Sequence, residues 1–324
     1  MKIYQNYPLM QTVREEETFR TPKNIFLKAL IFIAVFFALE IAEGFGMTLG
    51  AMPRLMEWAR EQVAVNGNLD TAQMTEKLNS LLLDPQLTYI MLWATGLGTL
   101  VVLLFCRAIE GRKFRTMGFF KEKAGIQYLA GLGIGFALFS CVVGLSYAMG
   151  GLHFEDAGTV TPMLLVILLG YGIQGMSEEV MCRGYLMTTI MRHHNVWVAV
   201  GINALFFGLM HGANAGFSGL ALVNLILYAV MISLYTLRTN SLWGSCAIHS
   251  IWNFAQGNFY GLPVSGIDSG ESVFRMSLQG SPLVNGGDFG LEAGIPTSIV
   301  MITAICILLF VPIPFLDKKA GESA

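Results

Sequence analysis

The sequence of 324 residues predicts an all-α polytopic membrane protein with about eight transmembrane helices. The first observation is composition: 54% of the residues are hydrophobic and 13% are charged, whereas soluble domains carry about 25% charged residues. The second is a set of apolar runs of roughly 20 residues, the length that spans a bilayer as a helix. No basic tract indicates nucleic acid binding.

The apolar runs divide the chain into predicted helices near residues 25–47, 87–109, 126–150, 161–191, 196–212, 218–237, 241–257 and 295–315. The first run follows a charged tail that is too long for the n-region of a signal peptide and has no clear small-residue cleavage site. We therefore expect an uncleaved membrane span at this position.

The connections between these runs alternate in basic content, as the positive-inside rule requires. Six basic residues crowd the second connection, between positions 107 and 123, and Arg192 and Arg238 lie in the fourth and sixth. Lys318 and Lys319 follow the last run. Although Arg54, Arg60 and Lys77 dilute the contrast in the first connection, the pattern predicts eight spans with both termini cytoplasmic.

Two connections are long enough to have structure of their own. Residues 52–85 have mixed charge and predict a partly helical cap outside the membrane, whereas residues 261–294 are rich in Gly, Ser and Asn and predict an outer loop. The predicted organisation is a cytoplasmic tail (1–24), two helices with the cap (25–125), a catalytic core (126–257), an outer loop (258–294) and a last helix with its tail (295–324).

The most informative motif is a pair of carboxylates at the end of an apolar run, Glu178 and Glu179, followed by Arg183. Ionisable groups inside a membrane cost about 2.5–3.5 kcal/mol each on insertion scales and are functional by default. Glu179 and Arg183 share a helix face at i,i+4 and can neutralise each other. Glu178 points about 100° away from Glu179 around the helix axis and lacks that partner. An unpaired carboxylate suits a general base or a proton shuttle. The structural alternative is a cluster of ion pairs that only holds helices together.

Two later helices carry the remaining polar groups. Phe207 and His211 share one face at i,i+4, and so do His249 and Asn253. By helical rise, Glu178 and His211 each lie about 20 Å from the turn that joins their helices, and His249 and Asn253 lie roughly 12–20 Å from the start of theirs. The four groups can therefore occupy one layer and activate a water, or bind a divalent metal such as zinc through Glu178, His211 and His249.

In this order, Glu-Glu-x-x-x-Arg at 178–183, Phe-x-x-x-His at 207–211 and His-x-x-x-Asn at 249–253 resemble the motifs of the CPBP family of intramembrane proteases. This family is also called Abi or CAAX-protease-like. It includes the type II CAAX prenyl endopeptidases and bacterial immunity proteins. The three motifs together cover about 80 residues, and their combination is specific.

The resemblance implies an eight-helix bundle around a polar cavity, in which Glu178 activates water and His211 assists. By the same resemblance, His249 and Asn253 stabilise the oxyanion, while Glu179 and Arg183 hold Glu178 in place. It further implies a hydrolase of the bacterial plasma (inner) membrane that acts on a membrane-associated peptide or protein. Whether a metal takes part is left open, because the same residues serve either mechanism.

Three other functions would account for part of this pattern. A rhomboid-like serine protease would pair Ser218, in the string Gly-Phe-Ser-Gly, with His249, but it leaves the carboxylates without a role. A proton-coupled transporter would show two matching halves, whereas the polar groups here lie in the C-terminal half. A scaffold or bacteriocin-immunity protein of the same family could keep the motif and act by binding. No His-Glu-x-x-His string is present, which argues against a zinc protease of the site-2 class.

The remaining polar and small residues predict packing or solvation. Glu40 and Glu43 could line the mouth of the cavity, but their place near the interface favours simple solvation. Glycines in the second and third runs are expected where helices approach closely: Gly96, Gly98, Gly131, Gly133 and Gly135. Five cysteines, none in a C-x-x-C pair, are expected to be small buried hydrophobic residues.

Overall fold

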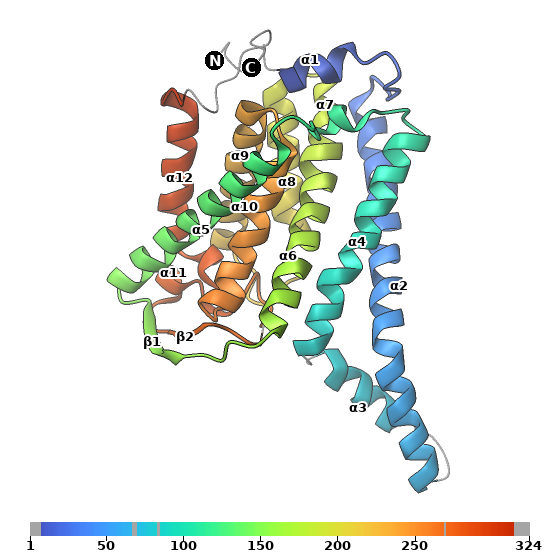
Figure 1. Cartoon of the computed structure of the whole chain (residues 1–324), viewed down its shortest axis with the longest axis vertical. Coiled ribbons are helices and arrows are strands. Elements are labelled where there is room, and N and C mark those ends of the chain that lie inside the picture. The colour runs from blue at the N-terminus through green and yellow to red at the C-terminus, as the bar shows by residue number, and fades with distance from the viewer. Residues whose placement is uncertain (1–7, 67–69, 83–84, 269, 314–324) are drawn as a thin grey trace.

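In the computed structural model of the protein, which describes residues 8–66, 70–82, 85–268 and 270–313, helices form an upright bundle with a small sheet at one end (Figure 1). Its first helices are α1 (Pro8–Glu15), α2 (Ile25–Asn66), α3 (Thr71–Leu82), α4 (Pro85–Ala108), α5 (Ala124–Ala148) and α6 (Met163–Glu179). The later helices are α7 (Thr188–Met191), α8 (Val196–Met210), α9 (Gly219–Thr239), α10 (Leu242–Phe254), α11 (Pro282–Asn285) and α12 (Ile295–Phe310).

Each predicted apolar run contains a helix in the structure. Five helices in the described part of the chain are long and apolar enough to cross a membrane: Ile25–Val65, Leu87–Ala108, Ala124–Ala148, Met163–Met191 and Gly219–Thr239. The helices α8 and α12 are apolar but shorter. Many large apolar side chains of α2 are exposed, with Phe26 82% and Ile41 73% accessible, as expected for a surface in contact with lipid.

The helix α10 lies inside the bundle, where it packs against α5 and α6. The helices α8, α9 and α10 each begin at a polar residue whose side chain accepts a hydrogen bond from a backbone N–H two or three residues later. These N-cap residues are Asn195, Ser218 and Ser241. The caps satisfy backbone donors that the first helical turn leaves unpaired, and they fix where the helices that carry the polar motifs begin.

Glycines allow α5 to approach α10 closely. A Cβ atom on Gly131 would lie 2.4 Å from the Gly244 carbonyl oxygen, and one on Gly135 would lie 2.6 Å from the Ile248 carbonyl oxygen. Gly133, on the other face of α5, has no heavy atom within 4 Å of such a position. The prediction of close packing is therefore correct for Gly131 and Gly135 and wrong for Gly133.

We expect Gly135→Ala to lower the free energy of unfolding by about 1–3 kcal/mol, because its methyl group would push the α5 and α10 backbones apart. The matched change Gly133→Ala should be neutral or slightly stabilising, since alanine favours helix and the site is open. Unfolding of the purified protein in detergent, followed by circular dichroism, compares the two. Equal stabilities would contradict the close contact at Gly135.

The helix α2 does not end near residue 47, where its apolar run stops, but continues through Pro53 to Asn66. A proline removes one hydrogen bond and bends a helix without necessarily ending it, and the surrounding residues are good helix formers. The far part of α2 and α3 extend beyond the rest of the bundle (Figure 1). Within the predicted cap, residues 52–85, the structure has helix at 52–66, at 71–82 and at 85.

An antiparallel pair of strands, β1 (Leu152–Ala157) and β2 (Phe274–Leu278), lies at the end of the bundle opposite α1 (Figure 1). Arg275 forms two hydrogen bonds with Asp156 across the pair, of 2.6 and 2.9 Å. Neither strand was predicted, because each is short and its partner is distant in the sequence. The pair fastens the long segment before α12 to the end of α5.

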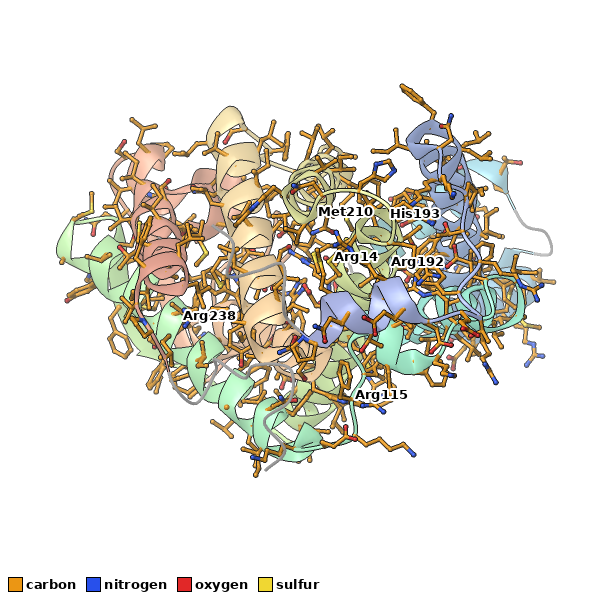
Figure 2. The ribbon with its side chains drawn as sticks, turned by 90° about the horizontal axis from the view of Figure 1, so that it is seen from above. Arg14, Arg115, Arg192, His193, Met210 and Arg238 are labelled. Carbon is orange, nitrogen blue, oxygen red and sulfur yellow. The ribbon has the colours of Figure 1, made fainter. Side chains whose placement is uncertain are left out.

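The opposite end is covered by α1 and is rich in arginine. The side chains of Leu9, Met10 and Val13 are buried beneath α1, and Arg192 donates to the Val13 carbonyl oxygen. Figure 2 shows the molecule from this end, with Arg14 on α1 and with Arg115, Arg192 and Arg238 labelled around it. The predicted C-terminal residues Lys318 and Lys319 lie outside the described residues.

Candidate active site inside the bundle

The three polar motifs converge from α6, α8 and α10. Glu178 and Glu179 end α6, and the chain continues as a π-helical segment, Val180–Met187. The helix α10 likewise passes into a π-helical segment, Ala255–Phe259, just after Asn253. Such π turns are rare and occur often at functional sites, where they redirect side chains.

Glu178 lies between the two histidines. Its Oε2 atom is 3.8 Å from His249 Nε2 and 4.0 Å from His211 Nε2, too far for direct hydrogen bonds. This oxygen is buried and has no hydrogen-bond partner among the described residues. The spacing suits a molecule that bridges the carboxylate and both imidazoles.

The hydrogen bond of His211 determines what its other nitrogen can do. His211 Nδ1 lies 2.8 Å from the Phe207 carbonyl oxygen, and since a carbonyl only accepts, Nδ1 carries a proton. In the neutral ring Nε2 is then an acceptor, like the carboxylate of Glu178. Two acceptors 4.0 Å apart cannot bond to each other, but a water can donate one hydrogen to each.

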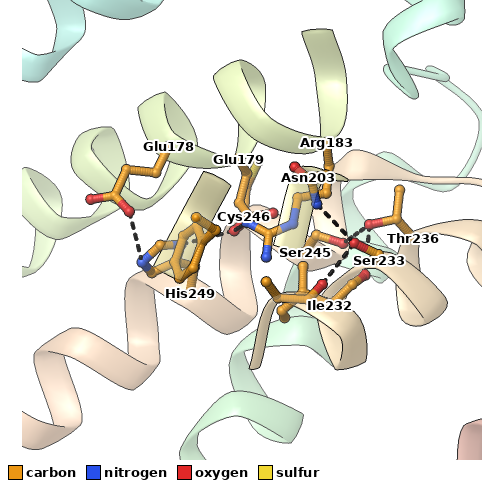
Figure 3. Close-up of polar contacts among 12 residues, drawn as sticks. Glu178, Glu179, Arg183, Asn203, Ile232, Ser233, Thr236, Ser245, Cys246 and His249 are labelled. Carbon is orange, nitrogen blue, oxygen red and sulfur yellow. Dashed lines mark hydrogen bonds and ion pairs between the residues drawn. The ribbon is translucent and has the colours of Figure 1, made fainter. Parts of the chain in front are cut away.

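His249 is fixed by the second carboxylate. Glu179 Oε1 accepts hydrogen bonds from His249 Nδ1 at 2.9 Å and from Arg183 Nη1 at 2.8 Å (Figure 3). The side chains of Glu179 and Arg183 are 0% exposed, and Arg183 also lies over the Phe207 ring at 4.6 Å. The ion pair therefore balances charge in the interior and orients the His249 ring, with Nε2 toward Glu178.

Gln174 joins Asn253 to Glu178 and was not found from the sequence. Asn253 Nδ2 donates to Gln174 Oε1 at 2.9 Å, and Gln174 Nε2 donates to Glu178 Oε1. Gln174 lies one turn before Glu178 in an apolar helix, and this i,i+4 spacing was the available signal. These two hydrogen bonds hold Oε1 of Glu178 in place and leave its Oε2 atom available to another molecule.

These groups border a cavity of about 200 Å³, which is lined by Glu178, His211, His249 and Asn253. Tyr228 of α9 also lines it; its hydroxyl is buried without a hydrogen-bond partner among the described residues, and its ring lies 5.6 Å from that of His249. Nothing in the sequence distinguished Tyr228 from its neighbours. The predicted layer of four polar groups thus surrounds a space that can hold a small reactant.

The serine alternative has no support in this geometry. Ser218 caps α9, where its side chain accepts a hydrogen bond from the Ala221 backbone N–H. It is exposed and does not line the cavity. The structure therefore does not bring Ser218 to His249.

The metal alternative requires the three side chains to surround one ion. Ligands of a tetrahedral zinc, each about 2.0–2.2 Å from it, lie roughly 3.3 Å apart. Glu178 is 3.8 and 4.0 Å from the two histidines, and the described residues contain no group of three His, Cys, Asp or Glu side chains spaced to hold a metal. The ligand types are suitable, but their positions do not fit without movement.

The acidic pair on α2 lies outside the cavity. Glu40 is exposed, as expected for a solvated residue. Glu43, by contrast, is half-buried and accepts a hydrogen bond from Ser177 Oγ at 3.3 Å. A Cβ atom on Gly98 would lie 2.1 Å from its Oε1 atom, so Gly98 leaves room for this carboxylate beside α6. The prediction that Glu43 is simply solvated is therefore wrong.

Residues 159–255 match the family model described as type II CAAX prenyl endopeptidase Rce1-like. No curated protein and no solved structure matches the chain. The matched segment contains all six predicted site residues. Its family and the five long apolar helices together indicate an integral membrane protease. Residues 159–255 are therefore an Rce1-like domain of the type II CAAX prenyl endopeptidase family.

Proposed function

We propose that this protein is an intramembrane endopeptidase that hydrolyses a peptide bond of a membrane-associated protein or peptide. The observation that carries the proposal is the Oε2 atom of Glu178, which has no hydrogen-bond partner in the described residues and lies 4.0 Å from His211 Nε2 at the cavity wall. Two acceptors at this spacing can hold one water by both its hydrogens. A water held in this way presents its oxygen lone pairs to a carbonyl carbon.

In the proposed reaction, Glu178 takes a proton from this water as the oxygen attacks the peptide carbonyl carbon. His211 holds the second hydrogen and orients the attack. The tetrahedral intermediate then collapses with cleavage of the C–N bond, and the protonated Glu178 delivers its proton to the leaving nitrogen. One water is consumed and two peptide ends are released, so atoms and charge balance.

The developing oxyanion requires donors on its own side of the carbonyl. Asn253 and His249 both line the cavity, and we propose them for this role. His249 can donate from Nε2 when both ring nitrogens carry protons, a form that Glu179 favours by accepting from Nδ1. Preorganised donors of this kind typically contribute about 100- to 1,000-fold to the rate.

Glu179 and Arg183 act through their neighbours in this scheme. The Glu179 carboxylate orients His249, and Arg183 balances the Glu179 charge. We propose that Gln174 is a further positioning residue, since its amide holds the Glu178 carboxylate. None of these three side chains needs to touch the substrate.

We further propose eight membrane spans, with both termini on the cytoplasmic side of a bacterial plasma (inner) membrane. The arginine-rich end under α1 (Figure 2) supports this orientation under the positive-inside rule. The short helices α8, α10 and α12 would complete the eight spans. Accessibility labelling of single cysteines placed in α1 and in the β1–β2 pair tests the orientation, because the two ends should react from opposite sides.

A divalent metal such as zinc, held by Glu178, His211 and His249, is the alternative mechanism. When bound, it would polarise the carbonyl and lower the pKa of a bound water. Because these side chains do not fit a metal as they lie, we expect cleavage to survive prolonged chelation. Loss of activity in chelator and its return with zinc would instead support the metal.

The function itself is tested with a membrane-derived peptide pool and the purified, reconstituted protein beside its Glu178→Ala variant. We expect product ends in mass spectra that appear only with the native protein, and their sequences define the substrate class. Identical profiles from two folded proteins would contradict the peptidase and favour the scaffold or immunity role. Proton flux through the vesicles, lost in the variant, would point to a transporter.

A further inference from the structure

A third carboxylate borders the cavity that contains Glu178. Glu292 lies in the segment between β2 and α12, outside the matched family domain, yet it lines the same cavity together with Ser265. Only 8% of its surface is exposed. The proposed mechanism has no use for this group, and a buried carboxylate costs free energy unless it has partners.

Glu292 is held from both backbone and side chain. Its Oε2 atom accepts hydrogen bonds from the backbone N–H and the hydroxyl of Ser265, at 2.8 and 2.7 Å. Its carbonyl oxygen accepts from Asn224 of α9 at 2.7 Å. At Gly290 a positive φ of 95° allows the chain to pass close to the Pro263 carbonyl oxygen. The carboxylate is therefore fixed in place.

Both hydrogen bonds to the Glu292 carboxylate that the described residues make go to Oε2. No lysine, arginine or histidine lies within ion-pair distance of Glu292 there, in contrast to Glu179 with Arg183 at 2.8 Å. The chain thus neutralises one buried carboxylate with its own cation and leaves the other at the cavity wall uncompensated. A cationic group that enters the cavity would supply the missing charge.

We propose that Glu292 is a specificity residue that binds a cationic nitrogen of the substrate near the cleaved bond. The group is a lysine or arginine side chain or a free α-amino group, since all present N–H donors with positive charge. The inference rests on the proposed peptidase function. It assigns the segment between β2 and α12 a direct part in substrate recognition.

The test uses synthetic peptides built around one sequence that the native protein cleaves. Each position flanking the cleaved bond carries Lys, Nε-acetyl-Lys or norleucine in turn, with the N-terminus free or acetylated. We expect one cationic position to raise kcat/KM by about 10- to 100-fold over its neutral version, the range of a charge-assisted hydrogen bond. Acetylation of the lysine side chain and acetylation of the N-terminus show which of the two groups Glu292 binds.

Glu292→Gln should abolish this preference while leaving cleavage of the neutral peptides nearly unchanged, because glutamine can still accept from Ser265. Asp268→Asn is the matched control: it removes one acid from the chain just before β2, at an exposed position that does not line the cavity. It should retain the preference. A native protein without any preference, or a preference that persists in Glu292→Gln, would overturn the inference.

A binding measurement separates this inference from the proposed function. The labelled cationic and neutral peptides are titrated into Glu178→Gln protein in which Glu292 is intact or changed to Gln. Glu292-dependent binding without any cleavage by the native protein would overturn the peptidase and leave the cation site standing. Cleavage without Glu292-dependent binding or preference would overturn the cation site alone.

Discussion

Glu178→Gln is expected to lower kcat by about 100- to 10,000-fold, the usual contribution of general acid–base catalysis. Glutamine has nearly the shape of glutamate but cannot take the proton from water. KM should change little, since Oε1 can still lie against Gln174. The measurement is initial cleavage rates of a defined peptide over a range of concentrations in lipid vesicles.

The matched control is Glu61→Gln, the same chemical change on the exposed far part of α2. It should retain the native kcat and KM. Circular dichroism and elution from a sizing column in detergent establish that both variants are folded. A folded Glu178→Gln protein with the native kcat would remove the carboxylate from the mechanism.

Arg183→Met should lower the free energy of unfolding by about 3–5 kcal/mol, because it leaves the Glu179 carboxylate without its cation in a fully buried position. The loss is large because neither side chain can reach water. Unfolding of the detergent-solubilised protein, compared with the native protein, measures the difference.

The double variant Glu179→Gln with Arg183→Met should recover much of that stability, since it removes both charges and keeps an acceptor for His249 Nδ1. Activity should remain low in the double variant, because glutamine favours the imidazolium form of His249 less than a carboxylate does. If Arg183→Met were as stable as the native protein, the ion pair would contribute nothing to the fold.

The sequence was sufficient to place the helices and the polar layer, since both follow from short-range rules. Apolar runs locate the spans, and a fixed rise of about 1.5 Å per residue placed Glu178, His211 and His249 at similar heights. The pairing of Glu179 with Arg183 likewise follows from i,i+4 spacing. The structure has these groups within 4.0 Å of Glu178 or Glu179.

Contacts between distant segments could not be predicted in this way. Nothing local indicates that Asn253 reaches Glu178 through Gln174, or that Ser265 and Glu292 meet at the cavity wall. The strand pair β1–β2 depends on residues about 120 positions apart. The continuation of α2 beyond residue 47 was missed because hydropathy locates where a helix is apolar, not where it ends.

The central claim is that a water activated by Glu178 adds directly to a peptide carbonyl in the cavity. The most direct measurement is single-turnover cleavage of one defined peptide in ¹⁸O-labelled water by the reconstituted protein, with the masses of peptide products and of the protein followed together. We predict that the new carboxyl group carries the label, that no peptide–protein adduct forms, and that Glu178→Gln forms labelled product at least about 100-fold more slowly than the native protein. A covalent adduct, or labelled product from Glu178→Gln at the native rate, would contradict the claim.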